Sequence, residues 1–221
     1  MTLNYKVFGD ENAPPLLILH GLFGMLDNWQ SLARKFSQHF RVFVIDQRNH
    51  GKSPQSLAFD YYVMADDILQ FMQEQQLEHC SIIGHSMGGK IAMQFAVDNA
   101  DQLNKLVVVD IAPKDYPRGH DAIFDAFFSI DIATVDSRGM AETALAAHIP
   151  DIAVRQFLLK NLKRNKTGGY AWKANFEAIF YGYDHILSSS LGAFDTFDKP
   201  TLFVKGGNSP RYIELPTDER S

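Results

Sequence analysis

Residues 84–89 have the clearest potential for chemistry in this chain. Ser86 stands between Gly84 and Gly88 in a Gly-X-Ser-X-Gly pattern, after a short apolar run and before a run with helical spacing. A strand that turns into a helix within two residues crowds the backbone, and glycine lacks the Cβ atom that would clash there. This context predicts a nucleophile elbow that exposes the Ser86 hydroxyl at the end of a sheet. The competing interpretation is a glycine-rich turn without chemistry.

A hydroxyl nucleophile needs an acid that orients its base, and the sequence offers two positions for that acid. Asp110 directly follows the apolar run 106–109 and comes after Ser86 in the chain, which is the expected order. Asn208 follows the apolar run 201–204, but an amide would not stabilise an imidazolium by charge. The equivalent change in a serine protease costs about 10⁴ in rate, so we predict Asp110 as the acid.

The base is the missing part of the pattern. The order serine, aspartate, histidine requires a histidine after the last strand, and no histidine follows His185. Either the sequence is shortened by some tens of residues or it is a natural variant. We favour the first explanation, because ending here would leave the strand at 201–204 as a bare sheet edge.

The elements that position these residues alternate along the chain. Apolar runs predict strands at 3–8, 16–19, 41–45, 80–83, 106–109 and 201–204, and helices at 29–36, 63–75 and 90–97. Strands that are apolar on both faces and separated by helices indicate a parallel sheet covered on both sides.

Residues 114–195 interrupt that alternation and are predicted to form helices without strands. We expect a helical cap over the carboxyl ends of the strands, where open α/β sheets bind ligands, inserted into a core of residues 1–113 and 196–221. Trp172 either packs between cap helices or contacts substrate. The basic residues at 160–166 are expected at a solvated helix end, with an anion site as the less favoured alternative.

Composition and charge exclude several classes of protein. Among 221 residues, 21 Lys and Arg against 26 Asp and Glu give a net charge of −5, which does not favour nucleic acid or an anionic membrane as a partner. The single cysteine, Cys80, excludes an internal disulfide framework and suits a reducing compartment. No apolar run approaches the ~20 residues of a membrane span, and no signal peptide is evident. We therefore expect a soluble cytoplasmic protein.

Three motifs together carry a resemblance to a known family. They are His20-Gly21-X-X-Gly24, Asp46-X-Arg48-X-X-Gly51-X-Ser53 and Gly84-His85-Ser86-Met87-Gly88-Gly89. In this order they resemble the α/β-hydrolase superfamily, and the sequences at 46–51, 109–113 and 206–210 are similar to the YbfF-type small-acyl esterases. The resemblance implies the α/β-hydrolase fold, a mostly parallel sheet with helices on both faces and a helical cap. The final strand and helix of that family are missing here.

The resemblance and the chemistry of acyl transfer imply roles for the residues around the elbow. The backbone N–H groups of Leu22 and Met87 would hold the oxyanion. Phe23 is a candidate substrate contact. His85 either lines the pocket rim or points away from the nucleophile.

Other polar residues of these motifs are expected to be structural. The ring of His20 is expected to hydrogen-bond its own loop and is not predicted to be the base. Asp46 and Arg48 are expected to hold the loop that carries His50, without touching substrate.

The predicted activity is that of a serine hydrolase. It would cleave small- to medium-chain carboxylic esters or thioesters through an acyl-enzyme on Ser86, with no cofactor and no metal ion. Alternatives on the same fold are an acyl-CoA thioesterase, a perhydrolase and a C–C bond hydrolase. From a different class, the chain could be a catalytically dead hydrolase that binds a small ligand. The oligomeric state does not follow from the sequence.

Overall fold

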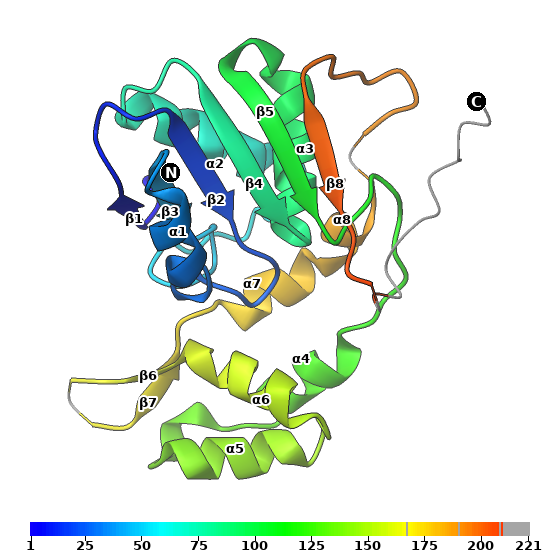
Figure 1. Cartoon of the computed structure of the whole chain (residues 1–221). Helices are drawn as coiled ribbons and strands as arrows, with labels where there is room; N and C mark the ends of the chain where they lie inside the picture. The colour runs from blue at the N-terminus through cyan, green and yellow to red at the C-terminus, as the bar shows by residue number, and fades with distance from the viewer. Residues whose placement is uncertain (167, 190, 208, 210–221) are drawn as a thin grey trace.

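The computed structural model describes residues 1–166, 168–189, 191–207 and 209, and in these residues a six-stranded sheet forms the centre of the molecule (Figure 1). The strands, in spatial order, are β1 (Tyr5–Phe8), β3 (Arg41–Ile45), β2 (Pro15–Leu19), β4 (Cys80–His85), β5 (Leu103–Val109) and β8 (Thr201–Val204). Only the pairing of β1 with β3 is antiparallel within this sheet. The prediction of a mostly parallel sheet is confirmed.

Helices cover both faces of this sheet. Consecutive residues of a strand point to opposite sides, so a strand that is apolar throughout has two apolar faces to bury. Leu16 and Ile18 of β2 pack in the cluster that includes Ala33 of α1 (Gln30–Phe36). Leu17 and Leu19 pack in the larger cluster that includes α2 (Tyr61–Glu74) and α3 (Met87–Asp98). Two 3₁₀ turns, η1 (Leu26–Asn28) and η2 (Ala100–Gln102), complete the core.

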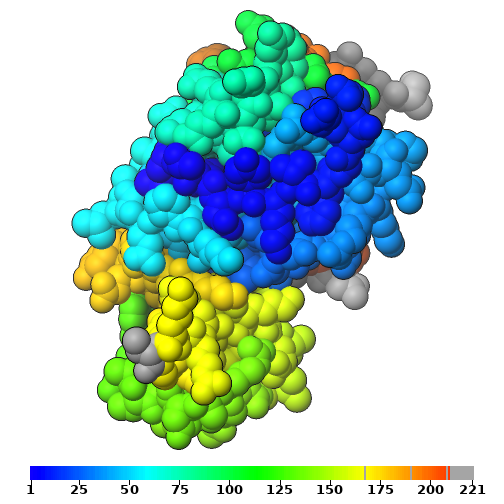
Figure 2. Space-filling view, turned by 90° about the vertical axis from the view of Figure 1, so that its left-hand side faces the viewer, coloured from blue at the N-terminus to red at the C-terminus, as the bar shows by residue number. Residues whose placement is uncertain are grey.

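Most of the segment between β5 and β8 forms a lobe below the sheet, where Figure 1 labels α4, α5, α6, β6, β7 and α7 and Figure 2 shows them at the bottom of the molecule. Its elements are α4 (Asp121–Phe128), η3 (Ile132–Thr134), α5 (Arg138–Ala146), α6 (Ile152–Leu158), η4 (Leu159–Asn161), β6 (Leu162–Arg164), β7 (Tyr170–Trp172), α7 (Phe176–Tyr181) and α8 (Tyr183–Leu187). Rings form its interior: Phe127 stacks on Phe176 at 3.5 Å between centroids, and Trp172 meets Phe127 edge-on at 4.8 Å.

The prediction of a lobe without strands is wrong, because β6 and β7 pair antiparallel. The turn between them contains Gly168 and Gly169, whose φ values of 96° and 72° favour glycine. The Asn165 N–H closes the turn on the Gly169 carbonyl at 3.0 Å. Trp172, Lys163 and Arg164 therefore lie on a hairpin and not on a helix, whereas Lys160 lies in η4 (Leu159–Asn161), a 3₁₀ turn. None of the described helices combines the length and apolar character that crossing a bilayer requires.

Candidate active site

Ser86 occupies a tight turn between β4 and α3. Its φ of 52° and ψ of −119° lie outside the regions that non-glycine residues favour, and its N–H is fixed by the Val109 carbonyl of β5 at 2.9 Å. A Cβ atom on Gly84 would lie 2.2 Å from the Gly88 carbonyl oxygen, and one on Gly88 would lie 2.4 Å from that of Leu19. Only glycine fits at these two positions, so the pattern read in the sequence forms the predicted elbow.

The loop after β2 brings a second backbone segment against the elbow. The Gly24 N–H donates to the Gly21 carbonyl at 2.9 Å, which closes a turn with Leu22 and Phe23 at its centre. A Cβ atom on Gly21 would lie 3.2 Å from the Ser86 Cβ, so the two segments nearly touch. Within the described part of the chain, the Leu22 N–H makes no hydrogen bond to a protein acceptor.

Two buried histidines hold this loop in place. His20 accepts a hydrogen bond from the Gln47 N–H at Nε2 (2.9 Å), so its Nδ1 carries the proton and donates to the Gly21 carbonyl at 2.8 Å. His50 accepts from the Phe23 N–H at Nε2 (3.1 Å) and donates to the Arg48 carbonyl through Nδ1 (2.9 Å). Both imidazoles are neutral and fully engaged, as burial lowers the pKa of His20 to about 4 and that of His50 to about 3.

The low pKa values predict a pH-dependent loss of stability. Below about pH 6.5 the unfolded chain binds a proton at each of these two histidines and the folded chain does not, so the free energy of unfolding falls as pH decreases. The expected contribution is about 1.4 kcal/mol per pH unit for each histidine down to its folded pKa. His50→Gln keeps an acceptor for the Phe23 amide and should flatten the decline between pH 6.5 and 4.5. Urea denaturation of this variant beside the exposed-site control His39→Gln measures it, and equal slopes would contradict the assignment.

Asp46 and Arg48 act as the sequence predicts, by fixing the loop between β3 and α2. The Asp46 carboxylate accepts from the N–H of Leu26 at 2.7 Å and from Asn4 Nδ2 at 2.7 Å. Arg48 pairs with the buried Asp67 at 2.6 Å and donates to two backbone carbonyls.

Asp110 stands beside Ser86 at the same edge of the sheet. His85 and Val109 are the last paired residues of β4 and β5, and Ser86 and Asp110 follow them directly. Asp110 has a φ of 55°, so both strands end in strained residues. Its carboxylate accepts from the Gly206 N–H at 3.2 Å, in the turn after β8. Asn208, the competing position, lies outside the described residues.

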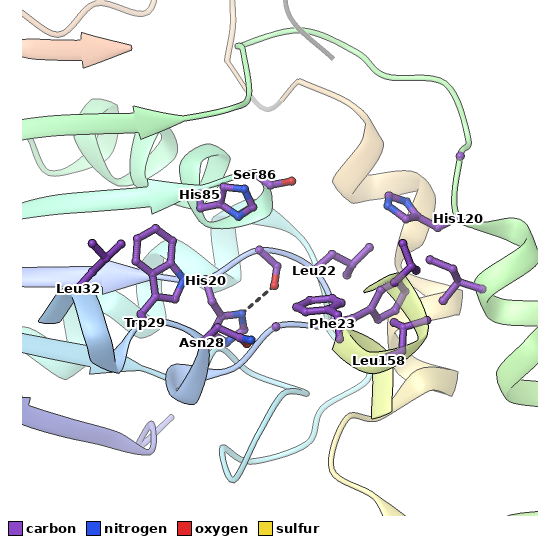
Figure 3. Close-up of a pocket in the computed structure, with 16 residues that line it drawn as sticks. His20, Leu22, Phe23, Asn28, Trp29, Leu32, His85, Ser86, His120 and Leu158 are labelled. Atoms are coloured by element: carbon purple, nitrogen blue, oxygen red, sulfur yellow. Dashed lines mark hydrogen bonds between the residues drawn. The ribbon is translucent and has the colours of Figure 1, made fainter. Parts of the chain in front are cut away.

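Two cavities meet at Ser86. The larger, of about 710 Å³, is mostly apolar (Figure 3). It is lined by His20, Gly21, Leu22, Phe23, Gly24, Asn28, Trp29, Leu32, His85, Ser86, Gly119, His120, Ile123, Val154, Phe157 and Leu158. The smaller, of about 320 Å³, lies on the α3 side and shares Leu22, Ser86, Gly119 and His120 with the larger one. The hydroxyl is thus placed between two chambers, which suits a substrate with two dissimilar ends.

The structure gathers most of the predicted site residues around these cavities. Leu22 and Met87 line the smaller cavity, and Phe23 and His85 line the larger one. Trp172 is not among the lining residues of either cavity and packs between rings of the lobe. Its predicted contact with substrate has no support in this geometry, and the packing interpretation fits better.

Comparison with known proteins agrees with this geometry. Residues 14–210 match the family model for the alpha/beta hydrolase fold. The chain belongs to the α/β-hydrolase family. It is 36% identical to the esterase YbfF of Escherichia coli over 210 residues, which is 95% of this chain and 80% of that protein. It is 38% identical to the sn-1-specific diacylglycerol lipase ABHD11 of Danio rerio, over 96% of this chain and 69% of that one. Among solved structures, a marine microorganism esterase superimposes with a TM-score of 0.93 at 40% identity, over 96% of this chain and 83% of that one.

Some contacts of this α/β-hydrolase site were not foreseen from the sequence. Asn161, fully buried in the lobe, donates to the Phe23 carbonyl at 2.8 Å and so ties the lobe to the loop after β2. His120 borders both cavities and shares a hydrogen bond with the Tyr183 hydroxyl through Nδ1. Neither residue stands in a motif, and only the folding of the lobe onto the sheet reveals them. Among the described residues, no group of three or more His, Cys, Asp or Glu is arranged to hold a metal ion.

Proposed function

We propose that this protein is a carboxylic ester hydrolase that forms an acyl-enzyme on Ser86. One observation carries the proposal: a serine in a strained elbow lines two adjoining cavities. The esterases and the lipase to which the chain is similar support the same class of substrate, a small-molecule ester. The acyl chain is proposed to be small to medium in length.

The proposed mechanism gives each of these groups one role. Ser86 attacks the ester carbonyl, and the negative charge that develops on its oxygen is held by the N–H groups of Leu22 and Met87. Met87 is the first residue of α3, so its N–H has no partner within the helix and adds to the positive end of the helix dipole. Asp110 orients the base and stabilises its charged form. The tetrahedral intermediate then expels the alcohol, which takes the proton that the base removed from Ser86, and leaves the acyl group on Ser86. Water that gives a proton to the same base attacks the acyl-enzyme, and the base returns that proton to Ser86 as the acid is released.

The base is the open part of this mechanism. His20 and His50 use both ring nitrogens in backbone contacts and stay neutral, so neither is available to take the Ser86 proton. We propose that the base is a histidine that follows the last strand in the chain, a position that residues 1–221 do not fill.

A series of p-nitrophenyl esters from acetate to decanoate tests the proposed activity. It is best run on residues 1–221 extended by a strand, a histidine-bearing loop and a helix from an α/β-hydrolase relative, here called the extended protein. Turnover with a maximum at short or medium chains supports the proposal. Absence of turnover for every ester, in a protein shown to be folded, would overturn it.

A second candidate is a catalytically dead hydrolase that binds a small ligand. It is favoured by His20 and His50, whose ring nitrogens are all engaged with backbone groups. A fluorophosphonate probe separates the two, because it reacts only with an activated serine. The extended protein carries a histidine at the expected position, so labelling of Ser86 there shows that the elbow, the acid and the oxyanion site are competent for chemistry, as the enzyme requires. Absence of labelling despite that histidine supports the binding protein.

Asp110→Asn is expected to lower kcat of the extended protein by about 10⁴, because the amide cannot stabilise the charged base. Asn keeps the shape of the side chain, so the melting temperature should change little. Asn208→Ala is the matched control at the competing position and should leave kcat nearly unchanged. The opposite order of effects would move the acid to the turn after β8.

We further propose that residues 114–195 act as a cap that selects substrates by chain length. Phe157 of α6 lines the larger cavity, whereas the half-buried Trp172 packs against rings of the lobe and lines neither cavity. Phe157→Ala is expected to shift the preferred ester toward longer chains by enlarging the cavity. Trp172→Ala should lower the melting temperature and reduce the rates for all esters by a similar factor. A change in chain-length preference for Trp172→Ala alone would reverse these two roles.

A further inference from the structure

The two cavities at Ser86 differ in charge. The residues that line the larger one include no Lys, Arg, Asp or Glu, whereas Lys90, Lys114 and Arg118 line the smaller one and no carboxylate does. The charge of Arg118 is offset by two carboxylates, those of Asp121 and Asp184. The two lysines remain as the cationic groups of this chamber.

Lys90 is a buried cation one helical turn beyond Ser86 on α3. The residue is 3% exposed, and its ammonium group donates to the carbonyls of Leu187 at 3.0 Å and Ser188 at 2.9 Å. An ammonium group has three N–H donors, so these two contacts leave one. Burial lowers the pKa of Lys90 to about 8, a cost that an anion beside it would offset.

Lys114 approaches the same place from the segment after β5. Its ammonium group lies 5.1 Å from the centre of the Tyr116 ring, and that of Lys90 lies 5.0 Å from the same centre. The separation of the two ammonium groups is therefore at most the sum of these two distances. Both cations therefore lie around one ring, that of Tyr116, which also lines the smaller cavity.

No carboxylate neutralises this pair within the described part of the chain. Neither lysine takes part in a salt bridge there. Asp115 is the acidic residue whose charge acts on Lys90, and one oxygen of its carboxylate accepts from the Ser189 N–H at 2.6 Å. The positive charge of the smaller cavity is therefore only partly balanced by the protein itself.

We propose that the smaller cavity binds an anionic group of the substrate, a carboxylate or a phosphate, between Lys90 and Lys114. This inference rests on the proposed function, because the anion is placed on one end of an ester whose carbonyl lies at Ser86. The neutral, apolar end then enters the larger cavity. A volume of about 320 Å³ suits a short chain that ends in the charged group.

Equilibrium binding to the Ser86→Ala protein tests the proposal without hydrolysis. Two pairs of ligands place the charge on either side of the ester: hexyl hydrogen adipate against hexyl methyl adipate, and 4-(hexanoyloxy)butyrate against its methyl ester. Isothermal titration calorimetry should show that the anion of at least one pair binds about tenfold more tightly than its neutral partner. The pair that shows this preference identifies which end of the ester enters the smaller cavity.

Substitutions of the lysines then assign the effect. Lys90→Met and Lys114→Met should each reduce the preference to threefold or less, and Lys114→Arg should retain most of it. Lys105→Met, at the exposed far end of β5, is the matched control and should change nothing. The Lys114 variants keep the test valid if loss of the Lys90 contacts disturbs the lobe.

Equal affinities of anion and neutral ester, or a preference that survives both Met substitutions, would overturn the inference. Tight binding of the neutral esters would in that case leave the proposed function intact. Failure of all four ligands to bind would overturn the inference and count against the proposed function as well.

Discussion

Replacing Ser86 with alanine is expected to abolish ester hydrolysis by the extended protein, with a loss in kcat on the order of 10⁶, as for the nucleophile of a serine protease. Ser86 stands in the strained turn of the elbow and lines both cavities. Labelling by a fluorophosphonate should disappear together with turnover.

The matched control for this substitution is Ser81→Ala in β4, five residues before the elbow. It removes a serine hydroxyl from the same strand and should retain labelling and turnover. Persistent labelling of the Ser86→Ala protein, located at another serine by peptide mass mapping, would contradict the assignment of the nucleophile.

Residues 1–221 expressed alone are expected to hydrolyse esters on the order of 10⁶-fold more slowly than the extended protein, because removal of the histidine from a serine triad has that effect. A residual rate about 10³–10⁴-fold above that of the uncatalysed reaction should remain, because the oxyanion hole and substrate binding still contribute. Parallel measurements of kcat for the two proteins test this expectation.

Three histidines line the larger cavity, and His20 is excluded because both its ring nitrogens are engaged with backbone groups, so the alternatives are His85 and His120. Figure 3 shows His85 next to Ser86 and His120 across the cavity from it. If residues 1–221 turn over esters within tenfold of the extended protein, one of these histidines has taken the role of base. His85→Ala and His120→Ala would then identify it.

Much of the fold and the centre of the site could be predicted from the sequence, because strong local rules specify them. A Cβ atom would clash at both Gly84 and Gly88. Their spacing around Ser86 is therefore a strong local signal for the elbow. Asp110 directly follows β5, which pairs in parallel with β4, so it lies at the same edge of the sheet as Ser86. The apolar runs of the sheet are long enough to show which strands are covered on both faces.

The lobe was predicted less well, because its structure depends on contacts that local patterns do not encode. The strands β6 and β7 are three residues long, too short for alternation to be recognised. For Trp172 the sequence left both packing and substrate contact open, and its contacts with Phe127 and Phe176 now favour packing. Lys90 was placed on an apolar helix, but the sequence did not show that its ammonium group is buried. That burial depends on the carbonyls of Leu187 and Ser188, which lie far away in the sequence.

If the lobe selects substrates as proposed, the hydrogen bond from Asn161 to the Phe23 carbonyl would link that selection to the chemistry that follows. The Leu22 N–H is proposed to hold the oxyanion, and Phe23 is the next residue in the same turn. Because Asn161 belongs to η4, a displacement of η4 would move that turn. A lobe held open by an ill-fitting substrate would misplace a donor by a fraction of an ångström, which is enough to weaken a short hydrogen bond. Discrimination between substrates would then appear in kcat as well as in KM, as in enzymes in which closure around the correct substrate assembles the catalytic groups.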